Sequence, residues 1–160
     1  MISIRVREKV KKLVKFLSLP LKRKLLFIEA FLHLGRARIL KSLPFKKVAK
    51  GLGEKAIETT TNTSDDRSKI KDVATAIHIM SKHTLWESAC LVQAIAAMKM
   101  LERRGIESTI YLGTAKDKKQ KMVAHAWLRS GPYYVTGAKG MNRFTVVGMF
   151  AKLLDKKGQT

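Results

Sequence analysis

Two residues of this chain have the types needed for nucleophilic catalysis, Cys90 and His125. Cys90 is the only cysteine, so it cannot form an intramolecular disulfide and is either a small buried hydrophobe or a thiol kept for chemistry. A thiol becomes a strong nucleophile when its thiolate is stabilised and a base lies within hydrogen-bond reach, and histidine is the most common base. The two residues therefore predict a thiol–imidazole dyad, provided that the fold brings them together.

The residues around Cys90 predict a helix that would activate the thiol. Thr84 and Glu87 have the spacing of a capping box, and apolar residues with a helical period follow. We expect a helix from about 86 to 104, with Cys90 in its first or second turn. The free N–H groups and the positive end of the helix dipole at that point favour the thiolate.

The same helix start would supply an oxyanion site. The backbone N–H of Cys90 is a natural donor, because the first N–H groups of a helix lack intrahelical partners. Trp86 and Ser88 are close in sequence and would line the site, although plain packing is an equal interpretation for Trp86.

His125 lies in a segment that predicts a strand, residues 122–129, followed by a turn at Gly131 and a returning strand at 133–136. Alternation places His125 on the same face as Trp127, which would line the site. Alanines on both sides of His125 leave room for another element to pack closely. A satisfied core histidine and a buried core cysteine remain the alternatives for each residue taken alone.

Several blocks of the chain resemble a known family of enzymes, the transglutaminase-like cysteine peptidases that remove the leader in lasso-peptide biosynthesis. The resemblance extends from about residue 17 to 151. It is carried by residues 86–94 (Trp-Glu-Ser-Ala-Cys-Leu-Val-Gln-Ala), 101–106, 111–113 and 124–127 (Ala-His-Ala-Trp), with weaker support at 19–22, 43–45, 135–137 and 144–147.

The resemblance implies an α+β fold with a papain/transglutaminase-like core, in which a helix bearing the cysteine packs on a small antiparallel sheet, preceded by N-terminal helices. Carried over by position, Cys90 is the nucleophile and His125 the general base and later the general acid. The implied substrate is a ribosomally made precursor peptide of leader plus core. The implied partners are a leader-recognition protein and an ATP-dependent macrolactam cyclase that uses the freed amine.

The sequence departs from the family at the third catalytic position, where members often carry an aspartate. A hairpin centred near Gly131 places His125 opposite about residue 137, which is Gly137, with Thr136 beside it. Asn142 can orient an imidazole but its spacing does not match. Asp117, in a charged loop at 116–121 between two strands, is a loop alternative, and a backbone carbonyl is a further one. Because an orienting group aids a Cys–His pair without being required, activity is not excluded.

Charge and length set the remaining expectations. The chain has 160 residues and a formal net charge of +21, and its first 50 residues hold fifteen Lys and Arg against two Glu. A basic surface implies an acidic partner: peptide, protein, nucleic acid or anionic lipid. We expect no specific nucleic-acid partner, because no helix-turn-helix, aromatic platform or zinc module is present. No cofactor motif and no metal-ligand spacing is present either.

We expect a basic N-terminal helical region at 1–52, a flexible polar linker at 53–66 and the transglutaminase-like core at 67–160. The first region predicts helices at about 4–17 and 20–41, and another helix is expected from about 64 to 82. The first helix is basic and amphipathic, so it would lie in water, bind an acidic leader or rest on an anionic membrane. The protein is expected in the cytoplasm, with a peripheral position at the inner membrane face as a variant.

Two further hypotheses stay open beside the peptidase. The same fold could act as a catalytically weak or inactive module that binds the precursor or a partner protein. The charge alone would also suit a nucleic-acid-binding protein, whose non-specific binding would be strongly salt-dependent.

Overall fold

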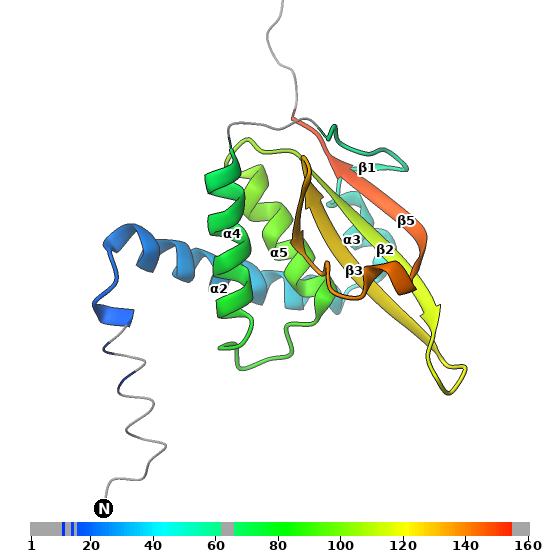
Figure 1. Ribbon diagram of the computed structural model, residues 1–160, viewed down its shortest axis with the longest axis horizontal. Helices are drawn as coiled ribbons and strands as arrows, with labels where there is room; N and C mark the ends of the chain where they lie inside the picture. The colour runs from blue at the N-terminus through cyan, green and yellow to red at the C-terminus, as the bar shows by residue number, and fades with distance from the viewer. Residues whose placement is uncertain (1–10, 12–13, 15, 62–65, 155–160) are drawn as a thin grey trace, which may run out of the picture.

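The protein is described by a computed structural model over residues 11, 14, 16–61 and 66–154 (Figure 1). It consists of helices packed against one antiparallel sheet, which confirms the expected α+β class. The elements are α2 (Leu21–Lys41), α3 (Phe45–Lys50), β1 (Glu54–Lys55), α4 (Arg67–Met80), α5 (Cys90–Glu102), β2 (Ser108–Lys116), β3 (Met122–Ser130), β4 (Tyr133–Thr136), the 3-10 helix η1 (Met141–Arg143) and β5 (Thr145–Lys152).

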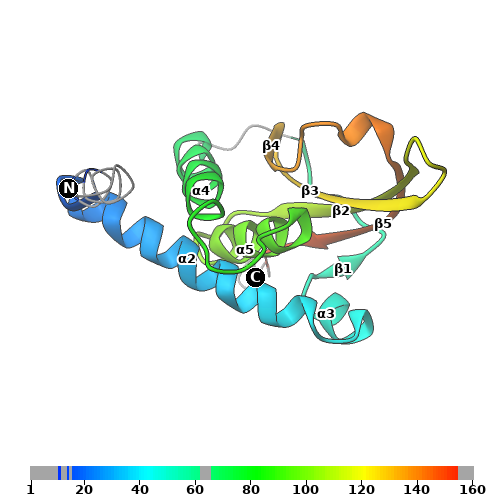
Figure 2. The ribbon, with the colours of Figure 1, turned by 90° about the horizontal axis from the view of Figure 1, so that it is seen from below.

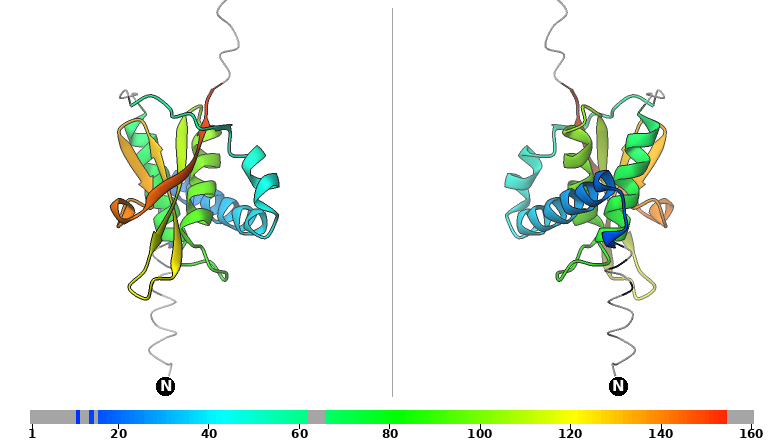
Figure 3. Two further views of the ribbon diagram at one scale, coloured as in Figure 1. Left: turned by 90° about the vertical axis from the view of Figure 1, so that its right-hand side faces the viewer. Right: turned by 90° about the vertical axis from the view of Figure 1, so that its left-hand side faces the viewer.

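The sheet has the strand order β1-β5-β2-β3-β4. The strands β2 and β3 pair antiparallel along their length, from Thr109 opposite Arg129 to Lys116 opposite Met122. The tip of this hairpin projects beyond the other strands (Figures 1 and 3). This tip is the charged loop expected at 116–121 between two strands.

The helix α5 is the centre of the core. Figure 2 shows it between α2 and the sheet, with α4 beside it. A helix that is apolar on all sides is buried on all sides, and this one buries eight residues: Val92, Ala94, Ile95, Ala96, Ala97, Met98, Met100 and Leu101. The sheet covers it with Ile110, Ala126 and Leu128. Cys90 is therefore held at the first residue of the most rigidly packed element.

The helix α2 buries one face, through Ala30, Leu34 and Ala37, against α5 and α4. An ion pair fixes it to the end of α5: Arg104 donates to both carboxylate oxygens of Glu29, at 2.9 and 2.6 Å. The hydrogen bond from Arg104 lowers the pKa of Glu29, against the opposing effect of partial burial. The expected helix at 20–41 is confirmed, whereas the one at 4–17 lies mostly outside the described residues.

The capping-box prediction is wrong. The helix does not begin near 86 but at Cys90, and its N-cap is Ala89, whose side chain cannot cap. Instead, the Thr84 hydroxyl forms hydrogen bonds within the loop before the helix, at 2.9 Å to the Trp86 carbonyl and 2.8 Å to Ser88 Oγ. These contacts hold residues 84–88 in an irregular turn, so the helix starts later and Cys90 becomes its first residue.

The segment expected to be a flexible linker is partly built into the sheet. Its residues Glu54 and Lys55 form β1, which pairs with β5. Thr59 is buried, and both its N–H and its hydroxyl lie 2.9 Å from Thr109 Oγ1. Residues 62–65 lie outside the described part, and the domain limits at 52 and 66 stay a prediction.

Arg129 ties this segment to the sheet from a buried position. Its guanidinium donates to Tyr111 Oη at 2.9 Å, to the Gly131 carbonyl at 2.7 Å and to the Thr59 carbonyl at 2.9 Å. Tyr111 in turn donates to Glu58 at 2.5 Å. Burial, together with this bond, raises the pKa of Tyr111, so the hydroxyl stays protonated as a donor.

We expect Arg129→Met to lower the free energy of unfolding by about 3 kcal/mol, because it leaves buried carbonyl groups without donors. Urea denaturation followed by circular dichroism measures this. The exposed Arg143→Met is the matched control and should change stability by less than about 0.5 kcal/mol. Equal effects of the two substitutions would contradict the role assigned to the Arg129 bonds.

Within residues 16–61 and 66–154, no helix is long and apolar enough to cross a bilayer.

Candidate active site

Cys90 occupies the first turn of α5 and is half-buried. Its predecessor Ala89 is extended, at φ −65° and ψ 172°, and the first helical hydrogen bond runs from Gln93 N to Ala89 O at 3.0 Å. The N–H groups of the first turn therefore have no intrahelical acceptor. They and the helix dipole create a positive potential at this point, which would stabilise an oxyanion.

The loop before the helix is braced on both sides of Cys90. Ser88 Oγ bonds Thr84 Oγ1, and the Ser88 carbonyl accepts a 2.7 Å hydrogen bond from Gln93 Nε2. Trp86 packs on α2, where its ring centroid lies 5.1 Å from that of Phe31. Its indole N–H is buried and has no hydrogen-bond partner among the described residues. The recorded contacts of Trp86 are thus with α2, and its role as a site-lining residue stays a prediction.

His125 lies on β3, and its imidazole has a defined partner. Nε2 is 2.7 Å from the backbone carbonyl of Gly137. A carbonyl can only accept, so Nε2 must carry the proton. In the neutral ring this leaves the lone pair on Nδ1. The imidazole is therefore held in the tautomer whose Nδ1 is free to accept a proton.

Gly137 is the residue on which this arrangement depends. It has φ +72°, a conformation that L side chains rarely adopt, and it lies directly against β3. A Cβ built on it would lie 2.3 Å from the Ala126 carbonyl oxygen and 2.9 Å from Trp127 Cα. No side chain fits there, so an aspartate is excluded at 137 and the main chain supplies the acceptor instead.

Of the three candidates for an orienting group, only Gly137 bonds the imidazole. The Thr136 hydroxyl is buried without a partner among the described residues, and Asn142 is exposed in η1. Asp117, the loop alternative, accepts the N–H groups of Lys119 and Lys121 in its own turn.

Aromatic rings form the walls around the imidazole. Trp127 lies 5.9 Å from the His125 ring and is stacked on Tyr111 at 5.6 Å with 8° between the planes. Phe144 lies 4.9 Å from the imidazole on the other side. Gly113 opposes His125 in the sheet, and a Cβ there would come within 2.9 Å of both Trp127 and Phe144. The two rings pack against the partly buried imidazole and restrict its orientation.

The structure shows a hydrogen bond between His125 and Gly137, but His125 lies on the other face of β3 from the residues that pack on α5. Ala126 and Leu128 belong to the core with α5, whereas His125 and Trp127 alternate with them. Pairing of β3 with β4 ends at Leu128 opposite Thr136, so His125 lies where this edge of the sheet is open. No hydrogen bond connects Cys90 with His125 among the described residues.

A small cavity lies between α5 and the segment after β4, and neither Cys90 nor His125 lines it. It has a volume of about 190 Å³ and is lined by Gln93, one turn after Cys90, and by Thr136, Gly137 and Ala138 after β4, with Ala74, His78, Tyr134 and Val135. The carbonyl that holds the imidazole thus borders the same space as the first turn of the cysteine helix. Catalytic hydrogen bonds are often long without substrate and tighten on binding.

Two features of the site have little signal in the sequence. A carbonyl acceptor carries no side chain, so spacing can place residue 137 opposite His125 but cannot select its carbonyl. Phe144 is distant in sequence and is brought to the imidazole by β5 pairing beside β2. In the part of the chain that the structure describes, no three His, Cys, Asp or Glu side chains are placed as ligands for a metal ion.

Comparison with known proteins identifies the family of the chain. A family profile described as the transglutaminase-like superfamily matches residues 34–149, which span α2 to β5 and include Cys90 and His125. No curated protein and no solved structure gives a significant match. The matched family is typically cysteine peptidase-like. Because the match covers well over half of the chain, the protein belongs to the transglutaminase-like superfamily.

Proposed function

We propose that the protein is a cysteine peptidase that removes the leader from a lasso-peptide precursor. The family membership supports a cysteine hydrolase, and the resemblance of the segments at 86–94 and 124–127 supports the finer substrate class. The observation that carries the proposal is the bond from His125 Nε2 to the Gly137 carbonyl, since it leaves Nδ1 as the base. The reaction would take place in the cytoplasm, where a lone thiol stays reduced.

The chemistry follows from these groups. His125 Nδ1 takes the proton of Cys90, and the thiolate attacks the carbonyl carbon of the scissile peptide bond. The N–H groups of the first turn of α5 stabilise the resulting oxyanion. The protonated imidazole then gives its proton to the leaving amine, which becomes the free α-amine of the core peptide. Water, deprotonated by the same imidazole, hydrolyses the thioester and releases the leader.

The test is cleavage of a lasso-peptide precursor, mixed with its leader-recognition protein and followed by mass spectrometry. A leader fragment and a shortened core that form only with intact Cys90 would support the peptidase. Binding of the precursor without any product mass would instead support the alternative, an inactive transglutaminase-like module that holds the precursor or a partner.

The exposed face of α2 supports a docking site for the leader-recognition protein. Five aliphatic residues, each 49–71% exposed, follow one line along the helix, opposite its buried face: Leu21, Leu25, Ile28, Leu32 and Ile39. Exposed apolar stripes of this size mark interaction sites. Lys22 and Arg36 flank the stripe, and a depression of about 340 Å³ lies beside it. We propose that a partner with an apolar groove and an acidic rim binds here.

We expect Leu25→Glu combined with Leu32→Glu to weaken binding of the leader-recognition protein at least about tenfold, because both side chains would be desolvated at the interface. Isothermal titration calorimetry measures the affinity. Leu85→Glu with Val147→Glu, two other exposed apolar residues, adds the same charge elsewhere and should leave binding unchanged. If the α2 variant kept its partner but no longer bound phosphatidylglycerol vesicles, the stripe would face the membrane instead.

A further inference from the structure

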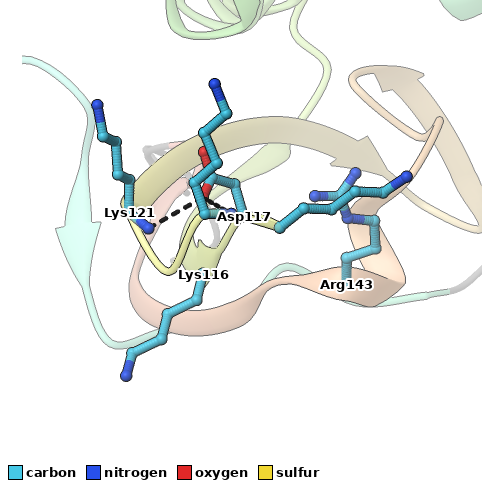
Figure 4. Close-up of a pocket in the computed structure, with 6 residues that line it drawn as sticks. Lys116, Asp117, Lys121 and Arg143 are labelled. Carbon is cyan, nitrogen blue, oxygen red and sulfur yellow. Dashed lines mark hydrogen bonds between the residues drawn. The ribbon is translucent and has the colours of Figure 1, made fainter.

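We propose that a basic concavity beside His125 binds an acidic segment of the peptide substrate, an inference that rests on the proposed peptidase function. The basic concavity is formed by the tip of the β2–β3 hairpin and by η1, and it has a volume of about 780 Å³. Figure 4 shows Arg143 reaching from η1 toward the hairpin, with Lys116, Asp117 and Lys121 on the hairpin itself. The full lining is Lys116, Asp117, Lys118, Lys119, Lys121 and Arg143.

The positive charge of this concavity is not neutralised. Its five cations face a single carboxylate, and Asp117 Oδ1 already accepts backbone N–H groups from Lys119 at 2.8 Å and Lys121 at 2.9 Å. None of the five cations forms an ion pair within the described ranges. All five are exposed, so they remain available to an anionic ligand.

Phe144 lies between one wall of the concavity and the proposed catalytic base. The Arg143 guanidinium lies 5.6 Å from the centre of the Phe144 ring, and that ring lies 4.9 Å from the imidazole of His125. On the hairpin, Gly113 opposes His125, and Lys116 follows three residues later on the same strand. A peptide bound in extended form rises about 3.3 Å per residue, so a segment a few residues from the scissile bond would reach the lysines.

This position distinguishes a peptide from the other polyanions that a basic surface attracts. The substrate of a peptidase must bind next to its catalytic base, whereas a nucleic acid or a lipid headgroup need not bind there. Glu or Asp side chains on the substrate would pair with the lysines and set the register of the chain past His125. The net charge of +21 would also attract an acidic peptide over a long range, and salt would weaken this attraction.

The test measures binding of a fluorescein-labelled peptide of five Gly-Glu repeats by fluorescence anisotropy. The full chain carries Cys90→Ala, so cleavage cannot interfere. We expect saturable binding that is absent for five Gly-Gln repeats. The triple variant Lys118→Ala, Lys119→Ala and Arg143→Ala should weaken it at least about tenfold. The matched control Lys46→Ala, Lys47→Ala and Lys50→Ala removes the same charge from exposed positions of α3 and should weaken it less than about twofold.

A second readout reports the position of the peptide. Ring-proton NMR signals of His125 and Phe144 should move on addition of the Glu peptide in the parent protein, and should not move in the triple variant. Equal weakening by the two triple variants would show that only net charge matters and would overturn the proposal. So would a short duplex DNA or a phosphatidylglycerol vesicle that binds more tightly and loses affinity through the concavity variant alone.

These outcomes are separate from those of the peptidase proposal. Failure of the Glu peptide to bind would leave Cys90-dependent cleavage intact, whereas loss of that cleavage would leave a measured binding site without an enzymatic role.

Discussion

Replacing Cys90 with alanine is expected to reduce leader cleavage at least about a thousandfold, to the level of the uncatalysed mixture. The thiolate forms the covalent bond to the substrate, and no other thiol exists in the chain to replace it. The rate is measured by mass spectrometry of the precursor in the presence of the leader-recognition protein. Wild-type cleavage by purified Cys90→Ala would show that the nucleophile is elsewhere or that the activity is a contaminant.

The controls for this prediction separate chemistry from folding. Cys90 is half-buried at a helix start, so alanine there should leave the circular dichroism spectrum and the unfolding midpoint nearly unchanged. His125→Ala should lower cleavage in the same assay, because the base is lost. His83→Ala removes an exposed histidine in the loop after α4 and should have no effect.

Replacing Gly137 with alanine is expected to damage both the fold and the site. A residue with a Cβ at φ +72° costs about 1–2 kcal/mol by itself. The added atom would also lie 2.3 Å from the Ala126 carbonyl oxygen, so β3 or the segment after β4 has to move. We expect a loss of about 3 kcal/mol or more in the free energy of unfolding, measured by urea denaturation.

Gly140→Ala provides the matched control for this prediction. Gly140 has a similar φ, +79°, but a Cβ built on it meets nothing within 4 Å. It should cost only the conformational part, about 1 kcal/mol. Similar losses in the two variants would show that the contact with β3 is not what makes Gly137 necessary.

The Gly137→Ala substitution also tests the tautomer of His125. When the carbonyl of residue 137 moves, Nε2 loses the acceptor that fixes its proton, and the population with a free Nδ1 falls. Nitrogen NMR of the imidazole in the folded fraction should then show a mixture of tautomers in Gly137→Ala and mainly the Nε2–H form in the parent protein. A parent protein with mainly Nδ1–H would contradict the assignment of the base.

The thiol of Cys90 lies near the start of a helix, as the sequence predicts, but the predicted capping box does not form. The capping box predicts a helix start near 86, and the thiol in its first or second turn. The structure starts the helix at Cys90, because the Thr84 hydroxyl bonds Trp86 and Ser88 within the loop. Both versions place the thiol near free N–H groups. Thr84 has several possible acceptors within a few residues, and only the packed loop decides among them.

The orienting group for His125 shows what a sequence leaves open. Spacing places residue 137 opposite the histidine, and the structure finds the partner there, but as a carbonyl rather than a side chain. Every residue has a carbonyl, so its presence in the sequence carries no information. The shift in register between Leu128 and Arg129, and the positive φ of Gly137, aim that one carbonyl at the imidazole.

The sequence by itself determined the elements that carry the chemistry: a helix bearing the lone cysteine, a strand bearing the histidine and a charged hairpin between strands. Those depend on periodicity and turn residues, which act over a few positions of the chain. Only the tertiary structure decided that Gly137 holds the imidazole, that Phe144 joins Arg143 to His125, and that residues 54–59 close onto the sheet. Each of these contacts joins residues that the chain separates, and strand register and packing select them.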